Sequence, residues 1–267
     1  MSISPNQDTV QSMEMQEFHY INAISPNEQF QDVGLEGLIA VELEEIIKAK
    51  VLCAIMTIKA PNFIFRNRKL LKVTEDGTGC LINLNIFGTS VYTLCTCNHV
   101  IGLLNMLEEV HLNFPTLPKL KNLKLNKTDF INNLCWTDKI IDATVLVMTK
   151  SFAKMLISKG ARFLKSGAPK VGDHVEFYQC PNGKLSHTNG QIEYILKENL
   201  LYYMNADYGS SGSPLVNLAM EVVGIHKRFE TGTEEANKHP HKIIRTASNI
   251  KVIRCAMEYY LLSNLQK

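Results

Sequence analysis

Short strand-like segments separated by Gly, Pro and Asn turns dominate the chain beyond residue 50, and this pattern constrains the fold more than any other feature. Many short strands joined by such turns favour an all-β sandwich or barrel. Apolar positions at helical spacing predict a helix over residues 38–50 and a C-terminal helix over residues 248–262, with Ser248 or Asn249 as its N-cap. The expected strands span residues 51–58, 79–86, 91–97, 140–148, 173–178, 191–196, 200–204 and 221–229.

The composition is that of an ordinary globular protein, with 45% hydrophobic and 20% charged residues among 267. This length could hold one large domain or two small ones. Residues 1–35 are polar and are expected to form an extension that is either loosely ordered or packed on the outside. A formal net charge of only +2 argues against nucleic acid as the main partner.

Targeting and redox features point to a reducing compartment. The N-terminus has no basic start followed by an apolar run, so no secretory signal is predicted. No stretch approaches the roughly 18 consecutive apolar residues of a membrane span. The seven cysteines are scattered and odd in number, which disfavours a disulfide framework. We therefore expect a cytoplasmic or nuclear protein, without a membrane partner and without a cofactor.

The loop over residues 209–214, with the sequence GSSGSP, is the most informative segment for function. Gly and Ser supply unusual backbone angles cheaply, so a run of this kind is often a flexible surface turn. Here strand-like sequence follows at once and Pro214 stiffens the end of the loop. This arrangement suits a preformed turn that holds a serine out for attack, with backbone N–H groups converging beside it.

Two further residues could complete a catalytic set with Ser211. A serine hydroxyl is a weak nucleophile and needs a base within hydrogen-bond reach, itself oriented by a third group. His99 stands where an apolar strand ends, and Asp142 precedes the apolar run that begins at Ala143. Alone, such a His is commonly structural and such an Asp commonly caps a turn. Asp138 is the alternative acid, and Asp142 is preferred because the apolar run starts immediately after it.

In these segments the chain resembles the chymotrypsin-like serine peptidases, and especially branches without disulfides such as the HtrA-type and viral chymotrypsin-like proteases. The resemblance covers most of residues 50–255 and implies two packed six-stranded antiparallel β-barrels with a C-terminal helix. It rests on four segments in the family's order of His, Asp and Ser: residues 77–82, 96–100, 142–146 and 209–216.

The resemblance also implies a division of the chain and a function. After the polar extension over residues 1–35, one barrel over residues 36–160 would carry His99 and Asp142. A second over residues 161–267 would carry Ser211 and the helix. The implied function is that of a serine endopeptidase acting on protein or peptide substrates through an acyl-enzyme intermediate. Self-cleavage, with the N-terminal extension as a candidate substrate, stays an option.

The implied catalytic roles follow those of the family. Ser211 would attack the scissile carbonyl, and His99 would take the serine proton and later protonate the leaving amine. Asp142 would fix the imidazole tautomer. The backbone N–H groups of Gly209 and Ser211 would form the oxyanion hole.

Three departures from the secreted members of the family are informative. Ser210 stands where those members usually carry the Asp that receives a new N-terminal amine after zymogen cleavage, so no activation of that kind is expected. Val100 stands where they usually have a disulfide cysteine, in keeping with a reducing compartment. Ser213 replaces the more usual glycine two residues after the nucleophile.

The resemblance places a specificity pocket between the segment before the nucleophile and the strand that follows it. Asn205, Asp207 and Tyr208 belong to the first wall. His226 lies where viral chymotrypsin-like proteases have a histidine that reads Gln or Glu, and an imidazole can donate to either side chain. We therefore expect a preference for Gln or Glu before the cut. The alternative is that His226 is a buried strand histidine bonded to a neighbour. Asn205 disfavours an Arg or Lys preference, which Asp207 keeps open.

Two other interpretations compete with a peptidase. Cys95, Cys97 and His99 would point the same way on an extended strand and could offer three zinc ligands. No fourth ligand lies nearby and the spacing is not that of common structural sites, so no metal is predicted. The second alternative is a pseudoprotease that keeps the double-barrel fold as a binding module. The presence of all three triad residue types argues against it.

Overall fold

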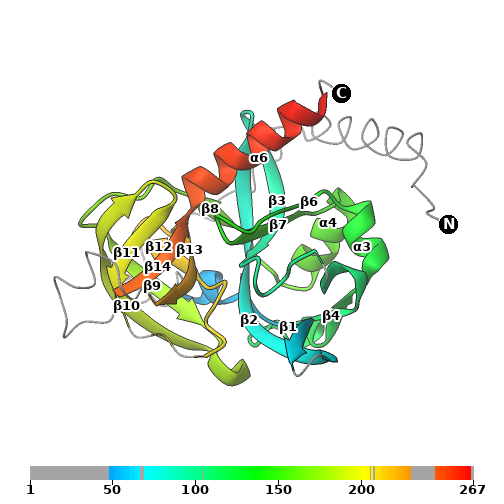
Figure 1. Cartoon of the computed structure of the whole chain (residues 1–267). Helices are drawn as coiled ribbons and strands as arrows, with labels where there is room; N and C mark the ends of the chain where they lie inside the picture. Colours follow the sequence, from blue (N-terminus) through cyan, green and yellow to red (C-terminus); the bar gives the residue numbers. More distant parts are fainter. Residues whose placement is uncertain are drawn as a thin grey trace.

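The computed structural model describes residues 48–66, 69–103, 105–204, 206, 208–229 and 244–265. Figure 1 shows two strand-rich halves side by side, with the C-terminal helix α6 running across them. The expected extension over residues 1–35 lies outside the described residues. So does most of the helix expected over residues 38–50, of which residues 48–50 are helical, with the helix continuing to residue 52.

The second half of the chain forms a closed antiparallel barrel of six strands. The order β12-β9-β10-β11-β14-β13 closes because β12 also pairs with β13. Alternate side chains such as Val175 and Phe177, or Leu200 and Tyr202, point inward and form a buried cluster, as the two-residue period of a strand requires. The strands are β9 (His174–Gln179), β10 (Ser186–Leu196), β11 (Asn199–Tyr203), β12 (Pro214–Asn217), β13 (Glu221–Phe229) and β14 (Ile244–Asn249).

The first half is a seven-stranded antiparallel sheet in the order β5-β4-β1-β2-β3-β7-β6. Among the described residues its edge strands β5 and β6 do not pair with each other. The pairings therefore close one barrel, and the expected second closed barrel is not confirmed. The strands are β1 (Ile55–Arg66), β2 (Lys69–Ile86), β3 (Thr89–Thr96), β4 (Val110–Asn113), β5 (Leu123–Leu125), β6 (Cys135–Asp138) and β7 (Ala143–Val147).

Short helical elements fill the connections. Two α-helices begin at side-chain caps, since Asn126 and Thr149 each accept hydrogen bonds from amides of the first turn. The helices are α3 (Lys127–Asn132) and α4 (Lys150–Ser158), and the 3₁₀ turns are η1 (Asn105–Leu107), η2 (Pro118–Leu120) and η3 (Pro181–Gly183).

The two halves share a junction. Strand β8 (Leu164–Ser166) pairs in parallel with both β2 and β13 and so joins the sheet of one half to the barrel of the other. Helix α6 (Ile250–Leu265) contacts β2, β13 and β14, and buries Ile250, Ile253 and Met257 at helical spacing. The predicted C-terminal helix is thus present, and of its two candidate caps Asn249 accepts the Lys251 amide at 3.0 Å.

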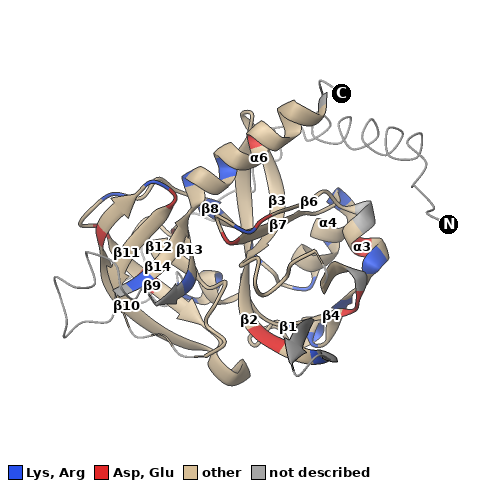
Figure 2. Ribbon diagram, in the orientation of Figure 1, with Lys and Arg blue, Asp and Glu red and all other residues tan. Residues whose placement is uncertain are grey.

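The remaining features of the described residues concern membrane crossing, charge and cysteines. Within the described ranges, no helix is both long and apolar enough to cross a membrane. Figure 2 shows basic and acidic residues interspersed along the described ribbon. All seven cysteines are unpaired, and four of them are buried.

Candidate active site

Strand pairing brings His99 and Asp142 together although 43 positions separate them. His99 lies in the turn that ends β3, and Asp142 directly precedes β7. These two strands are antiparallel neighbours, with Thr96 opposite Thr144, so the end of one lies beside the start of the other. The sheet register therefore fixes the separation of the two side chains.

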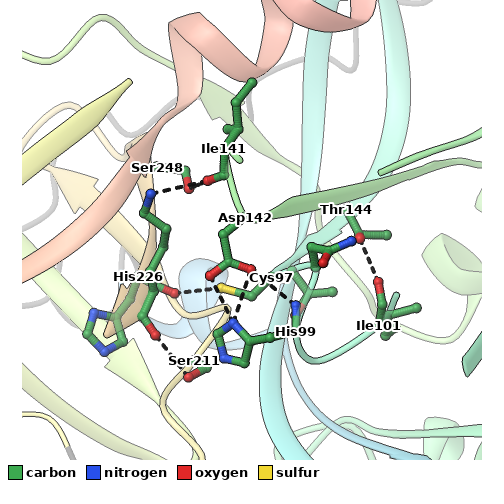
Figure 3. Close-up of polar contacts among 12 residues, drawn as sticks. Cys97, His99, Ile101, Ile141, Asp142, Thr144, Ser211, His226 and Ser248 are labelled. Atoms are coloured by element: carbon green, nitrogen blue, oxygen red, sulfur yellow. Dashed lines mark hydrogen bonds and ion pairs between the residues drawn. The ribbon is translucent and has the colours of Figure 1, made fainter. Parts of the chain in front are cut away.

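The pair has the geometry of an oriented base. His99 Nδ1 lies 2.8 Å from Oδ2 and 3.1 Å from Oδ1 of Asp142, and the backbone N–H of His99 also donates to Oδ1 at 3.1 Å. Figure 3 shows the imidazole and the carboxylate pointing toward each other. Burial acts to raise the pKa of Asp142, but the hydrogen bonds and charge of His99, with the Lys227 ammonium, outweigh it and lower that pKa. The carboxylate is therefore ionised at neutral pH.

Asp138, the alternative acid, serves the turn instead. Its Oδ1 accepts the amides of Ile140 and Ile141 at 2.7 and 2.8 Å. This turn keeps residues 139–142 out of the strand, and Asp142 leaves it with a φ of +57°. The strand expected from residue 140 therefore begins at Ala143.

The loop over residues 209–214 is held from both sides. On one side the amide of Thr78 donates to the Ser211 carbonyl and its hydroxyl donates to the Gly209 carbonyl, each at 2.8 Å. On the other side the Gly212 amide donates to the carbonyl of His226 at 2.8 Å. Gly209 and Gly212 have φ values of +89° and +91°, a region that suits glycine. The loop is therefore a preformed turn and not a flexible linker.

Ser211 shares a cavity of about 690 Å³ with His99 and Asp142. Its hydroxyl donates to the backbone carbonyl of Lys227 at 3.0 Å. Within the described part of the chain, no hydrogen bond connects Ser211 to His99, and the N–H groups of Gly209 and Ser211 have no acceptor. The structure thus brings the three side chains to one cavity without joining the serine to the base.

His226 is buried and also lines this cavity, and its expected role in reading the substrate stays a prediction. The Tyr202 hydroxyl contacts its Nδ1, and the ring of Phe177 packs edge-on at 4.9 Å. Burial, with the charges of Arg245 and His99, lowers the pKa of His226 to about 3. Burial also keeps Tyr202 protonated by raising its pKa. The imidazole is therefore neutral, and its proton lies on Nε2 if the phenol donates to Nδ1 or on Nδ1 if the phenol accepts.

The rest of the predicted pocket wall is only partly described. Asn205 and Asp207 lie outside the described residues. Tyr208 is largely exposed at the rim of the cavity, where Glu75, partial burial and Asp76 raise its pKa.

A metal fits this site poorly. Among described residues, the donor atoms of Cys97, His99 and Asp142 lie within 4.8 Å of one another, while Cys95 is not part of the group. His99 Nδ1 and Asp142 Oδ2 already contact each other directly at 2.8 Å, and an ion would have to replace this contact. Burial also raises the pKa of Cys97 strongly, which opposes formation of a thiolate ligand.

Sequence reasoning missed several residues that shape the site: Thr78, Tyr202, Lys227, Arg245 and Ser248. Thr78 lies within the segment 77–82 that carried the family resemblance, so a signal was present there. A lysine in a strand is ordinarily solvent-facing, and nothing in the sequence marks Lys227 as 7% exposed.

Comparison with known proteins supports the fold and little more. No protein-family profile matches the chain, and no curated protein is a significant match in sequence. Among solved structures, the chain is similar to the serine endoprotease from Yersinia pestis, with a TM-score of 0.54 and 16% identity over 82% of this chain and 67% of that chain. Likeness at this identity concerns the fold. The superfamily expected from the motifs, and the branch within it, stay predictions.

Proposed function

We propose that the chain is a serine endopeptidase with Ser211 as nucleophile, His99 as general base and Asp142 as the residue that orients the base. The observation that carries this proposal is the 2.8 Å contact between His99 and Asp142 at a cavity that Ser211 also lines. Because Asp142 engages Nδ1, the other ring nitrogen is left to accept a proton from the serine.

The proposed reaction begins with a change in the serine hydroxyl. In the resting arrangement it donates to the carbonyl of Lys227, so it must rotate toward His99 before attack. The Asp142 carboxylate would then stabilise the imidazolium that forms. The unpaired N–H groups of Gly209 and Ser211 are the candidate donors to the oxyanion, where one donor is typically worth about 3 kcal/mol.

We also propose that no zymogen-type activation is needed. Ser210 is buried and has no carboxylate with which to receive a terminal amine. Thr78 instead holds the carbonyls on both sides of that residue, those of Gly209 and Ser211. These bonds come from β2, within the folded body, so the turn does not depend on a newly cut N-terminus.

The proposed substrate preference is Gln or Glu before the scissile bond. In the tautomer in which Nδ1 accepts from Tyr202, Nε2 of the neutral His226 carries the proton and is a donor. An Nε2 donor fits the oxygen of a carboxamide or of a carboxylate. Arg245 lines the same cavity and adds positive charge, which favours Glu over Gln.

Labelling by a fluorophosphonate probe tests the central proposal. We expect the wild type and Ser213→Ala to be labelled and Ser211→Ala to remain unlabelled. Ser213 is a matched control, because its buried hydroxyl has no hydrogen-bond partner among the described residues. An unlabelled wild type would refute the proposed peptidase function.

Matched peptides with Glu, Gln, Arg or Lys before the cut then test the proposed substrate preference. Cleavage mainly after Arg or Lys, unchanged in His226→Ala, would end the Gln/Glu proposal.

One observation favours a second candidate, a pseudoprotease that binds protein segments. The hydroxyl of Ser211 is bonded to Lys227 and not to His99, as expected of a site that does not react. Such a protein would not be labelled, and its Ser211→Ala variant would bind peptides as tightly as the wild type.

Self-cleavage is tested by the intact mass of the wild type and Ser211→Ala after overnight incubation.

A further inference from the structure

We propose that Lys227 is a positioning residue: with Ser248, it clamps the carbonyl of Ile141 and thereby fixes Asp142 beside His99. Its kinetic consequences rest on the proposed peptidase function, whereas its structural consequence can be measured without any activity. Lys227 and Ser248 both belong to the C-terminal barrel, and Asp142 belongs to the N-terminal half. Through the clamp, the C-terminal barrel therefore fixes the position of Asp142 in the N-terminal half.

A β-bulge aims Lys227 at this position. In the pairing of β13 with β14, His226 is opposite Ala247 and Arg228 is opposite Thr246, so Lys227 is the extra residue. A bulge leaves its extra residue outside the regular ladder and re-aims its side chain. His226 points into the barrel against Phe177, while the side chain of Lys227 crosses to the N-terminal half.

Two donors converge on the Ile141 carbonyl. Lys227 Nζ donates to it at 3.2 Å and Ser248 Oγ donates to it at 2.6 Å, both from buried residues. Lys227 Nζ also donates to Asn199 Oδ1 at 2.5 Å, so its position is itself fixed by β11. Figure 3 shows Ser248 beside Ile141, with Asp142 following directly in the chain. A lysine this buried requires partners, and the Ile141 carbonyl is one of them.

The clamped peptide determines where the Asp142 side chain points. Asp138 holds the amide of Ile141 from one side, and the clamp holds its carbonyl from the other. The next residue, Asp142, has a φ of +57°, a conformation that is uncommon outside glycine and persists when its surroundings fix it. Without the clamp, the peptide can turn toward an ordinary conformation, which would move the carboxylate away from His99.

The charge of Lys227 adds an electrostatic effect. Among the described residues, the titratable groups that act on Asp142 or respond to its charge are His99, Cys97 and Lys227, and Lys227 is the cation among them that is not part of the proposed reaction. Its ammonium offsets part of the carboxylate charge that His99 experiences. Loss of the lysine therefore removes both a donor to the Ile141 carbonyl and a charge that lowers the pKa of Asp142.

Kinetics of Lys227→Met test the proposal, because methionine keeps much of the chain length and removes the charge and the donor. We expect kcat to fall about 10- to 100-fold with KM changed less than threefold, as for a misplaced catalytic group. Ser248→Ala, which removes the other donor to the Ile141 carbonyl, should also lower kcat, and Lys227→Arg, which keeps a charged donor, should restore most of the lost kcat. Lys119→Met, at an exposed site, is the control.

A second measurement keeps the inference separate from the proposed function. The Nδ1 proton signal of His99, which reports the bond to Asp142, can be followed by NMR in wild type and Lys227→Met, with Ser248→Ala as a backup if the first variant does not fold. Loss or displacement of this signal in Lys227→Met supports the inference even if the wild type hydrolyses nothing. An unchanged signal, or kcat/KM within twofold of wild type, overturns it.

Discussion

Substitution of Gly212 by alanine should lower the free energy of unfolding and distort the loop over residues 209–214. Gly212 directly follows Ser211 and has a φ of +91°. A Cβ built there would meet the Thr78 carbonyl oxygen at 1.9 Å and Thr96 Oγ1 at 2.3 Å. Gly88 is the matched control, because its φ of +78° is similar and a Cβ there would meet nothing within 4 Å.

The comparison separates backbone strain from steric conflict. Alanine in the left-handed region costs about 1–2 kcal/mol at either position. At Gly212, either Thr78 or the loop must also shift, and overpacking of this kind costs about 1–3 kcal/mol. Thr96 Oγ1 donates to the same Thr78 oxygen at 2.8 Å, and losing that buried bond adds about 1–3 kcal/mol. We expect Gly212→Ala to cost about 2–6 kcal/mol more than Gly88→Ala.

Urea unfolding gives the two free energies, and the rate of fluorophosphonate labelling gives the state of the turn. Gly88→Ala should be labelled at the wild-type rate. Gly212→Ala should be labelled much more slowly under conditions where it is still folded. Equal destabilisation by the two substitutions would refute the packing argument, and normal labelling of a destabilised Gly212→Ala would refute the coupling of the turn to Thr78.

Three further predictions concern the same site. Thr78→Val removes the buried donor to Gly209 and should lower the unfolding free energy by about 1–3 kcal/mol and slow labelling, whereas Thr78→Ser should retain most of both. The pKa of Asp142 is lowered on folding, so its stabilising contribution is present above the ordinary value of 3.8 and is lost as pH falls through the lowered value. The stability gap between wild type and Asp142→Asn should therefore narrow at acid pH. His226 has a pKa near 3 when folded against an ordinary 6.5, so the unfolded chain binds the extra proton. Wild type should lose up to about 1.4 kcal/mol per pH unit below 6.5, and His226→Gln should lose less in urea melts.

The fold could be predicted where the local pattern and the tertiary structure agree. Residues 221–229 were expected as a strand and form β13 with those bounds, because apolar residues run between turn signals on both sides. Residues 51–58 were also expected as a strand, but β1 starts at Ile55, since residues 51–52 complete a helix. Helix α4 was missed although Thr149 caps it and Ala153 and Leu156 are buried at helical spacing.

The residues of the candidate site could be predicted from their order along the chain, but the contacts between them could not. The order of His99, Asp142 and Ser211 identified three residues that the structure brings to one cavity. The contacts that support them depend on strand register and a bulge, which single-sequence patterns do not encode. Strand β14 illustrates this, because Ser248 was one of two candidate helix caps, whereas its hydroxyl donates to the Ile141 carbonyl across the junction.

The support of the proposed triad comes mainly from contacts between the halves of the chain. Thr78 on β2 holds the serine loop of the C-terminal half, and Lys227 and Ser248 hold the Ile141 carbonyl of the N-terminal half. The N-terminal half therefore positions the loop that carries Ser211, and the C-terminal half positions Asp142. Because β8 and α6 join the halves, a change at that junction should disturb the relative placement of Ser211 and His99 before it unfolds either half. Loss of labelling at denaturant concentrations below the unfolding transition would follow from this arrangement.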